Sequence, residues 1–270
     1  MATQHPWRLS EVTLKQVREI GYEAAVLPFG ATEPHNLHLP YATDNIEVVE
    51  ICDRACRWAW ERGARVALLP HIPFGCDHNL MEFPMAISVD QALLNQIVES
   101  VAKSLERHNV MKLAVVNGHG GNEFKGGIRD IYGRSKVFCC LINWYQMMAD
   151  EGKKIFENHD GDHAEEMETS LVQALEPELV NMEWADDGAT RKSRFELARQ
   201  GGVWYPRPWE KLTKNSGCGD PRKASAEKGK RYLKAAEERF GNFLLELARA
   251  PMDEDFPFEP RKNGRSSRKK

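Results

Sequence analysis

The sequence predicts an α/β fold, a three-layer α/β/α sandwich with a mostly parallel central sheet. Apolar runs of strand length alternate along the chain with stretches of helical periodicity, as in sheets covered by helices. Polar turns containing glycine or histidine follow the first and third strands, where the carboxyl ends of parallel strands share one edge. With 270 residues, 41% of them hydrophobic, the chain can bury a full core.

We expect one domain over residues 1–255 and a basic, disordered tail over residues 256–270. The last ten residues contain no large apolar side chain and are rich in lysine and arginine. An inert solvated tail is preferred over a segment that contacts RNA or an acidic partner.

Periodicity and cap residues place the individual elements. Strands are expected at residues 24–30, 65–75, 112–117 and 137–145. Helices are expected at residues 8–20, 44–62, 88–107, 164–175 and 221–249, with one more beginning near residue 123. The strand at 65–75 is apolar on both faces, which favours a place inside the sheet. Residues 186–220 are expected to form a long ordered loop or a small β excursion that covers a pocket or a subunit contact.

Composition excludes several classes of function. A formal net charge of −3 and a pI near 6.3 give no general attraction to nucleic acid or to a membrane surface. No run of about eighteen apolar residues is present, and the first residues lack the features of a signal peptide. Six cysteines without C-x-x-C spacing favour reduced thiols. We therefore expect a cytoplasmic protein that acts on a small molecule.

The first polar segment, residues 33–44, has the density of ligands that a metal site needs. Glu33 and His35 are two apart, so on an extended chain their side chains leave the same face. Asp44 opens a predicted helix, where it is either a ligand that bridges two ions or an N-cap and nothing more. His38 stands between two leucines and is expected to be packed or hydrogen-bonded in the core.

The second polar segment, residues 118–122, joins the third strand to a helix. It lacks the lysine and hydroxyl of a phosphate loop and the spacing of a dinucleotide-binding turn. His119 lies in the middle of this turn, and Gly120 and Gly121 let the backbone approach a ligand closely. This combination favours a metal ion or a substrate oxyanion.

The third polar segment, residues 159–168, opens a helix. His163 and Glu168 are five apart, about 140° around a regular helix, so they share a centre only if His163 lies before or at the first turn. Glu165 and Glu166 are expected to be solvated residues of an acidic first turn, which the helix dipole favours.

Two further positions are candidates for substrate contacts. His78 follows the second strand and, with Asp77 and Glu82, either lines a pocket or belongs to an ordinary polar loop. Trp144 continues the fourth strand at its carboxyl end. Ser88 is the expected cap of the third helix.

Together these segments resemble the creatininase family. Its opening pattern, Glu, any residue, His, then His-Leu-Pro and a following Asp, matches residues 33–44. Its glycine loop matches residues 117–122, and its third block, His-Ala followed by Glu-Thr-Ser, matches residues 163–170. The resemblance implies an α/β/α fold, a homo-oligomer built as a hexameric trimer of dimers, and two divalent metal ions at the strand ends.

The resemblance also implies two sets of ligands that share one aspartate. They are Glu33, Asp44 and His119 for one ion, and His35 and Asp44 for the other. Creatininase proper completes the second set with a glutamate at the position of Gly121, so Glu168 is the candidate for the missing ligand. Zinc is the expected metal, with manganese and iron as alternatives, because all three accept carboxylate and imidazole ligands.

The function that follows is hydrolysis of a C–N bond in a small cyclic amide or formamide by water activated on the metal ions. The N–H groups around Gly120 and Gly121 are expected to stabilise the oxyanion. His163 is expected to carry the proton to the leaving amine, with Glu168 as a second catalytic group. One alternative is an inosose-type hydrolase that opens the ring of a cyclic diketone. The other is a metal-binding family member without catalytic activity.

Overall fold

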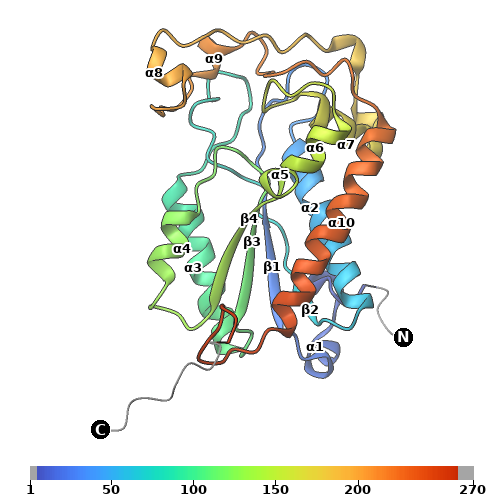
Figure 1. Ribbon diagram of the computed structural model, residues 1–270, viewed down its shortest axis with the longest axis vertical. Helices are drawn as coiled ribbons and strands as arrows, with labels where there is room; N and C mark the ends of the chain where they lie inside the picture. Colours follow the sequence, from blue (N-terminus) through green and yellow to red (C-terminus); the bar gives the residue numbers. More distant parts are fainter. Residues whose placement is uncertain (1–4, 261–270) are drawn as a thin grey trace.

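A parallel sheet of four strands forms the centre of the computed structural model, which describes residues 5–260 (Figure 1). The strand order is β2-β1-β3-β4, and each neighbouring pair is parallel. The strands are β1 (Ala24–Phe29), β2 (Val66–Leu68), β3 (Lys112–Asn117) and β4 (Phe138–Asn143). The predicted α/β fold with a mostly parallel sheet is confirmed.

Helices cover both faces of this sheet. In Figure 1, α3 and α4 lie on one side of the strands, and α2 and α10 lie on the other, with α7 packed against them. The longer helices are α2 (Thr43–Glu61), α3 (Gln91–Arg107), α7 (Glu166–Leu175) and α10 (Ala226–Arg249). The shorter helices are α1 (Leu14–Ile20), α4 (Lys125–Ile131), α5 (Trp144–Met147), α6 (Ala149–Ile155), α8 (Glu196–Arg199) and α9 (Trp209–Leu212). Single 3-10 turns occur at Leu9–Glu11, Pro177–Leu179 and Met182–Trp184.

The core is divided between the two faces by the alternation of side chains along the strands. Ala24 and Val26 of β1 pack with the helices α2 and α10, whereas Ala25, Leu27 and Phe29 pack with α3 and α4. Because both faces are covered, β1 is apolar at every position and buried throughout. This buried strand gives the turn that follows it a rigid base.

The second strand is shorter and lies farther out than the sequence indicated. Only Val66–Leu68 form a regular ladder with β1, and β2 is an edge strand of the sheet, so the predicted place inside the sheet is wrong. Pro70 and Pro73 follow at once. A proline has no N–H for a sheet hydrogen bond, so the regular ladder ends there. Ile72 still forms an isolated parallel bridge with Phe29.

Three other boundaries also differ from the prediction. The first helix begins at Leu14, where Thr13 forms a capping box with Gln16. The third helix has Asp90 at its N-cap position, and Ser88 Oγ instead accepts a hydrogen bond from Asp77 N (2.8 Å). Trp144 does not extend β4 but begins α5.

Residues 186–220 cross the top of the molecule in Figure 1, on the side where the strands end. This excursion contains the short helices α8 and α9 and, within the described residues, no regular strand. No helix in residues 5–260 is long and apolar enough to cross a membrane. Most of the predicted disordered tail, residues 261–270, lies outside the described residues, and a single domain over 1–255 stays a prediction.

Candidate metal centre

Glu33 and His35 lie in the turn that follows β1, and both are buried. A backbone hydrogen bond from Leu39 N to His35 O (3.4 Å) closes this turn, in which Asn36 takes a left-handed φ of 55°. His35 Nδ1 lies 3.1 Å from the carbonyl oxygen of Glu33. Because a carbonyl only accepts, Nδ1 carries a proton, and Nε2 is the nitrogen that faces Asp44 Oδ1.

Asp44 lies in the first turn of α2 but does not cap the helix. The N-cap position is occupied by Ala42, and no side chain makes a cap hydrogen bond there. The N-cap alternative is therefore wrong. The carboxylate faces two imidazoles instead, with Oδ1 3.1 Å from His35 Nε2 and Oδ2 3.0 Å from His119 Nδ1. One oxygen directed to each histidine is the arrangement expected of a carboxylate that bridges two ions.

His119 is fixed at the end of β3 by the side chain of Asn117. The Asn117 amide donates to His119 O (2.9 Å), and its oxygen accepts from His119 N (3.2 Å). The imidazole is buried, and its Nδ1 lies 2.8 Å from Glu33 Oε1. A Cβ atom at Gly121 would lie 2.3 Å from His119 Nε2. The same Cβ atom would lie 2.5 Å from the backbone oxygen of Cys76, so a larger residue at position 121 fits only if both the ring and the backbone move.

Glu168 reaches the same place from α7. Its Oε2 lies 3.8 Å from His35 Nε2 and accepts a hydrogen bond from Ala164 N (2.5 Å). His163 precedes the N-cap residue Glu165, so the helical geometry that separates residues five apart does not apply. The side chains of His163 and Glu168 therefore both lie beside the buried group of Glu33, His35, Asp44 and His119, here called the metal cluster.

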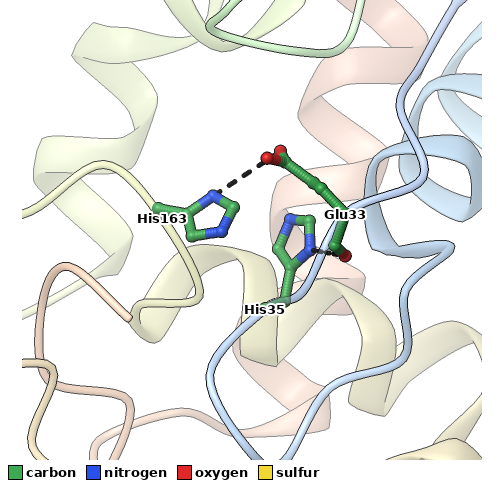
Figure 2. Close-up of side chains that lie close together, drawn as sticks. All are labelled: Glu33, His35 and His163. Carbon is green, nitrogen blue, oxygen red and sulfur yellow. Dashed lines mark hydrogen bonds and ion pairs between the residues drawn. The ribbon is translucent and has the colours of Figure 1, made fainter. Parts of the chain in front are cut away.

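His163 borders Glu33 from the other side (Figure 2). Its Nδ1 lies 3.9 Å from Glu33 Oε1, and its Nε2 donates to the carbonyl oxygen of Pro34 (2.9 Å). The ring stacks at a tilt on His35, with centroids 4.1 Å apart. Burial and the neighbouring His35 hold the pKa of His163 well below its usual range.

The cluster has more buried negative charge than the protein itself neutralises. Burial raises the pKa of Glu33 to about 8 and that of Glu168 to about 8. For Asp44, burial is outweighed by His35 and His119, which hold its pKa well below the usual range. Both oxygens of Glu33 and Oδ2 of Asp44 lack a donor in hydrogen-bond geometry among the described residues.

These observations fit divalent cations. Buried carboxylate oxygens without donors are unfavourable unless a cation meets them. Within the described residues, three overlapping groups each bring three ligand atoms within 4.8 Å of one another. The groups are Glu33 with Asp77 and His119; His35 with Asp44 and Glu168; and Glu33 with His35 and His163. Oxygen and imidazole ligands suit zinc and manganese alike.

Asp77 belongs to this cluster more closely than the sequence showed. It is fully buried, and its Oδ1 lies 2.7 Å from His119 Nε2, the nitrogen that faces away from Glu33 and Asp44. From the sequence, Asp77 was only a loop residue that either lines a pocket or does not. The position of Asp77 shortly after the second strand was the one sign in the sequence that it could reach the site. Its contact with His119, which follows the third strand, depends on the order of the strands in the sheet.

Two glutamates were predicted incorrectly. Glu165 and Glu166 are both buried, not solvated. The Glu165 side chain caps α7 through Met167 N. Glu166 binds Lys228 Nζ (2.5 Å) and the backbone N–H of Asn158 (2.7 Å). The helix dipole favours acidic residues in a first turn, but here α10 covers that turn and supplies a cation.

The cluster lies in a large cavity of about 1870 Å³. Its lining includes the predicted substrate contacts His78, Gly120, Gly121 and Trp144. His78 is mostly exposed and contacts Asp90 Oδ1 (3.0 Å), while Trp144 is buried. Glu82 is not among the lining residues. His38 is buried and its Nε2 is 2.8 Å from Thr169 Oγ1, as expected for a hydrogen-bonded core histidine.

Comparison with known protein families finds a match to one family over most of the chain. The model of the creatininase family, described as creatinine amidohydrolase, matches residues 10–244. A 3-dehydro-scyllo-inosose hydrolase of Thermotoga maritima is 30% identical over 188 residues, which are 65% of this chain and 58% of that protein. The creatinine amidohydrolase of Pseudomonas putida is 28% identical over 205 residues, which are 65% of this chain and 74% of that protein.

Solved structures agree on the fold. A Bacteroides fragilis protein described as a creatinine amidohydrolase aligns with a TM-score of 0.87 and 38% identity, over 93% of this chain and 100% of that one. A manganese form of creatininase aligns with a TM-score of 0.74 and 21% identity, over 90% of this chain and 99% of that one. A creatininase structure of a zinc–zinc type has the same TM-score at 22% identity.

Proposed function

The chain belongs to the creatininase family, and from this premise we propose that it is a metal-dependent amidohydrolase. The proposed reaction cleaves a C–N bond in a small cyclic amide or formamide. The observation that carries the proposal is the carboxylate of Asp44, which presents one oxygen to His35 and the other to His119.

The proposed ligands form two sets that share Asp44. They are Glu33, Asp44 and His119 for one ion, and His35, Asp44 and Glu168 for the other. When bound, divalent cations polarise the carbonyl of the substrate and make water nucleophilic at neutral pH. Zinc is proposed first, with manganese or iron as alternatives. Creatininases have been solved with manganese and with zinc.

The groups of the chain itself bind the substrate and move protons. His163 holds its own proton on Nε2 through the Pro34 carbonyl, which leaves Nδ1 unprotonated beside Glu33. We propose that Nδ1 accepts a proton from the attacking water and passes it to the amine nitrogen as the C–N bond breaks. Gly120, Gly121 and Trp144 line the cavity, and the N–H groups of the two glycines are the proposed donors to the oxyanion.

Asp77 is proposed as a positioning residue for His119. Its carboxylate lies 2.7 Å from Nε2, so it favours a proton on that nitrogen and a lone pair on Nδ1, which faces Glu33 and Asp44. A carboxylate behind a ligating histidine orients the ring and makes it more basic.

A ring-opening hydrolase of a cyclic diketone is the second candidate. The 30% identity with an inosose hydrolase of Thermotoga maritima favours it. The two candidates differ in the bond that is broken, since only the amidohydrolase releases an amine or ammonia.

The test is a metal analysis followed by a panel of lactams, formamides and cyclic diketones. We expect about two ions per chain, loss of metal in Glu33→Ala and His119→Ala, and amine release in step with substrate loss. Ring opening without amine release would select the second candidate. Full metal occupancy in both variants would contradict the ligand assignment, and bound metal without turnover of any compound would indicate a non-catalytic family member.

We also propose a cytoplasmic homo-oligomer, such as the hexamer that the family implies. All six cysteines are free thiols, which suits a reducing compartment. Large apolar side chains such as Tyr132 (91% exposed) and Met85 (75% exposed) are available for subunit contacts. Light scattering of the purified protein tests the assembly, and a monomeric mass would contradict it.

A further inference from the structure

One wall of the cavity is unusually basic. Residues 191–211, which contain α8 and α9, contribute six cationic side chains to the lining and no acidic one. This basic wall consists of Arg191, Lys192, Arg194, Arg199, Arg207 and Lys211. The whole chain has a formal net charge of −3, so a stretch of the lining with six cations and no acid differs from the balance of the chain.

Most of these cations lack a carboxylate partner. Arg207 pairs with Asp162 (3.0 Å), and Lys211 lies only at the limit of an ion pair with Glu210 (4.0 Å). Arg199 donates to a backbone carbonyl, at Ser193 O (2.8 Å).

Lys192 and Arg194 form no ion pair with any residue of the described chain. Like charges held in one short segment repel one another, and an anion bound among them would relieve that repulsion.

An aromatic contact connects the basic wall to the proposed catalytic residues. The guanidinium of Arg207 lies 4.7 Å from the ring centroid of Trp209. Trp209 is buried and packs on His163, with ring centroids 4.8 Å apart. The wall therefore begins one aromatic ring away from the side chain that is proposed to carry the proton. Trp204, which is 84% exposed, extends the aromatic lining outwards.

The size of the cavity agrees with a substrate larger than a simple lactam. Its volume of about 1870 Å³ exceeds the roughly 300–1,000 Å³ that is typical of pockets for drug-sized ligands. A lactam or formamide alone would occupy a small part of this space and would leave the basic wall without a ligand.

We infer that the substrate carries an anionic group, a phosphate or a carboxylate, which the basic wall binds while the scissile bond lies at the metal centre. This inference rests on the proposed hydrolase function. Guanidinium groups bind phosphate and carboxylate oxygens in pairs of hydrogen bonds, which orients the bound group as well as attracting it. An aromatic or heterocyclic portion between the two ends would contact Trp204 and Trp209.

The test measures binding to the metal-free protein, so that the metal centre cannot attract the anion. The probes are phenylphosphonate, benzoate and neutral benzamide, which share an aromatic ring, and the readout is titration calorimetry. We expect phenylphosphonate or benzoate to bind at least about 10-fold more tightly than benzamide, with a difference that shrinks as salt rises. The stronger of the two anions identifies phosphate or carboxylate as the preferred group.

The test variant is Lys192→Gln/Arg194→Gln, and its control is Lys230→Gln/Arg231→Gln on the exposed surface of α10. Both remove two positive charges, but Lys230 and Arg231 do not line the cavity. We expect the anion to bind about 10-fold more weakly to the test variant and unchanged to the control. Equal binding of benzamide and both anions would overturn the inference, as would an equal loss in both variants.

Metal analysis of the same proteins separates the inference from the proposed function. If the wild-type chain holds its metal but shows no preference for anions, the inference fails and the proposed function stands. If anions bind at the wall while no metal is held, the proposed function fails and the anion site stands.

Discussion

The metal cluster and the basic wall face the same cavity but are built in opposite ways. Cluster residues such as Glu33, Asp44 and His119 are buried, and each is fixed at the end of a strand or the start of a helix. The basic wall is carried by an exposed excursion whose helices α8 and α9 have four residues each.

The difference indicates a division of roles. Side chains fixed by the sheet can hold the sub-ångström geometry that metal chemistry needs. An exposed segment can change its sequence at little cost to the core, and therefore suits recognition of the distal part of a substrate. Changes in the cluster should alter metal content or the chemical step, and changes in the wall should alter binding alone.

The largest effect is expected at Asp44, because both proposed ion sites use it. Asp44→Asn should remove both ions and lower kcat/KM by about 10³-fold or more, since metal ions supply several kcal/mol of charge stabilisation. Elemental analysis and kinetics measure the two effects. Asp130→Asn, the same change at an exposed residue of α4 that does not line the cavity, serves as the control. Retention of both ions in the Asp44 variant would contradict the bridging role.

A variant of His163 should lose activity without losing metal, which would distinguish the catalytic step from metal binding. His163→Gln is expected to lower kcat about 10²- to 10⁴-fold, the usual contribution of a positioned acid–base group, and to leave the metal content unchanged. The pH dependence of kcat should also flatten. If the variant loses metal, His163 is a ligand and not the proton carrier.

Asp77 tests whether the contact behind His119 matters for the ions. Asp77→Ala is expected to weaken the affinity for one metal ion about 10- to 100-fold, with Asp77→Asn intermediate. Competition with a chelator measures the affinity. An unchanged affinity in Asp77→Ala would show that Asn117 alone positions the ring.

The smallest effect is expected from pH in the absence of metal. Burial raises the pKa of Glu33 and Glu168 to about 8, above their usual value in an unfolded chain. These two carboxyls therefore hold more protons in the folded protein than in the unfolded one between about pH 4.5 and 8, and the stability that they contribute falls as pH rises through this window.

The melting temperature of the metal-free protein should accordingly decrease between pH 5.5 and 8.5 by a few degrees. The metal-loaded protein should not show this decrease, because the cations favour the ionised carboxylates. Lys192→Gln/Arg194→Gln should behave as the wild type. A parallel decrease with and without metal would show that these carboxylates do not meet the ions.

Local patterns were sufficient for much of the fold. The strands β1, β3 and β4, and the helices α2 and α10, lie close to the predicted ranges, because each has a clear apolar pattern. The predictions failed where contacts with segments distant in the sequence determine the position or burial of a residue. The strand order places β2 at an edge of the sheet, and α10 covers Glu166.

The sequence by itself determined the alternation of strands and helices, the polar turns that follow the strands, and the residue types able to bind a metal. It could not determine which oxygen of Asp44 faces which histidine, the contact of Asp77 with His119, or the turn of residues 191–211 towards the cavity. Only the tertiary structure decided these, because they depend on the order of strands in the sheet and on segments that meet from distant parts of the chain.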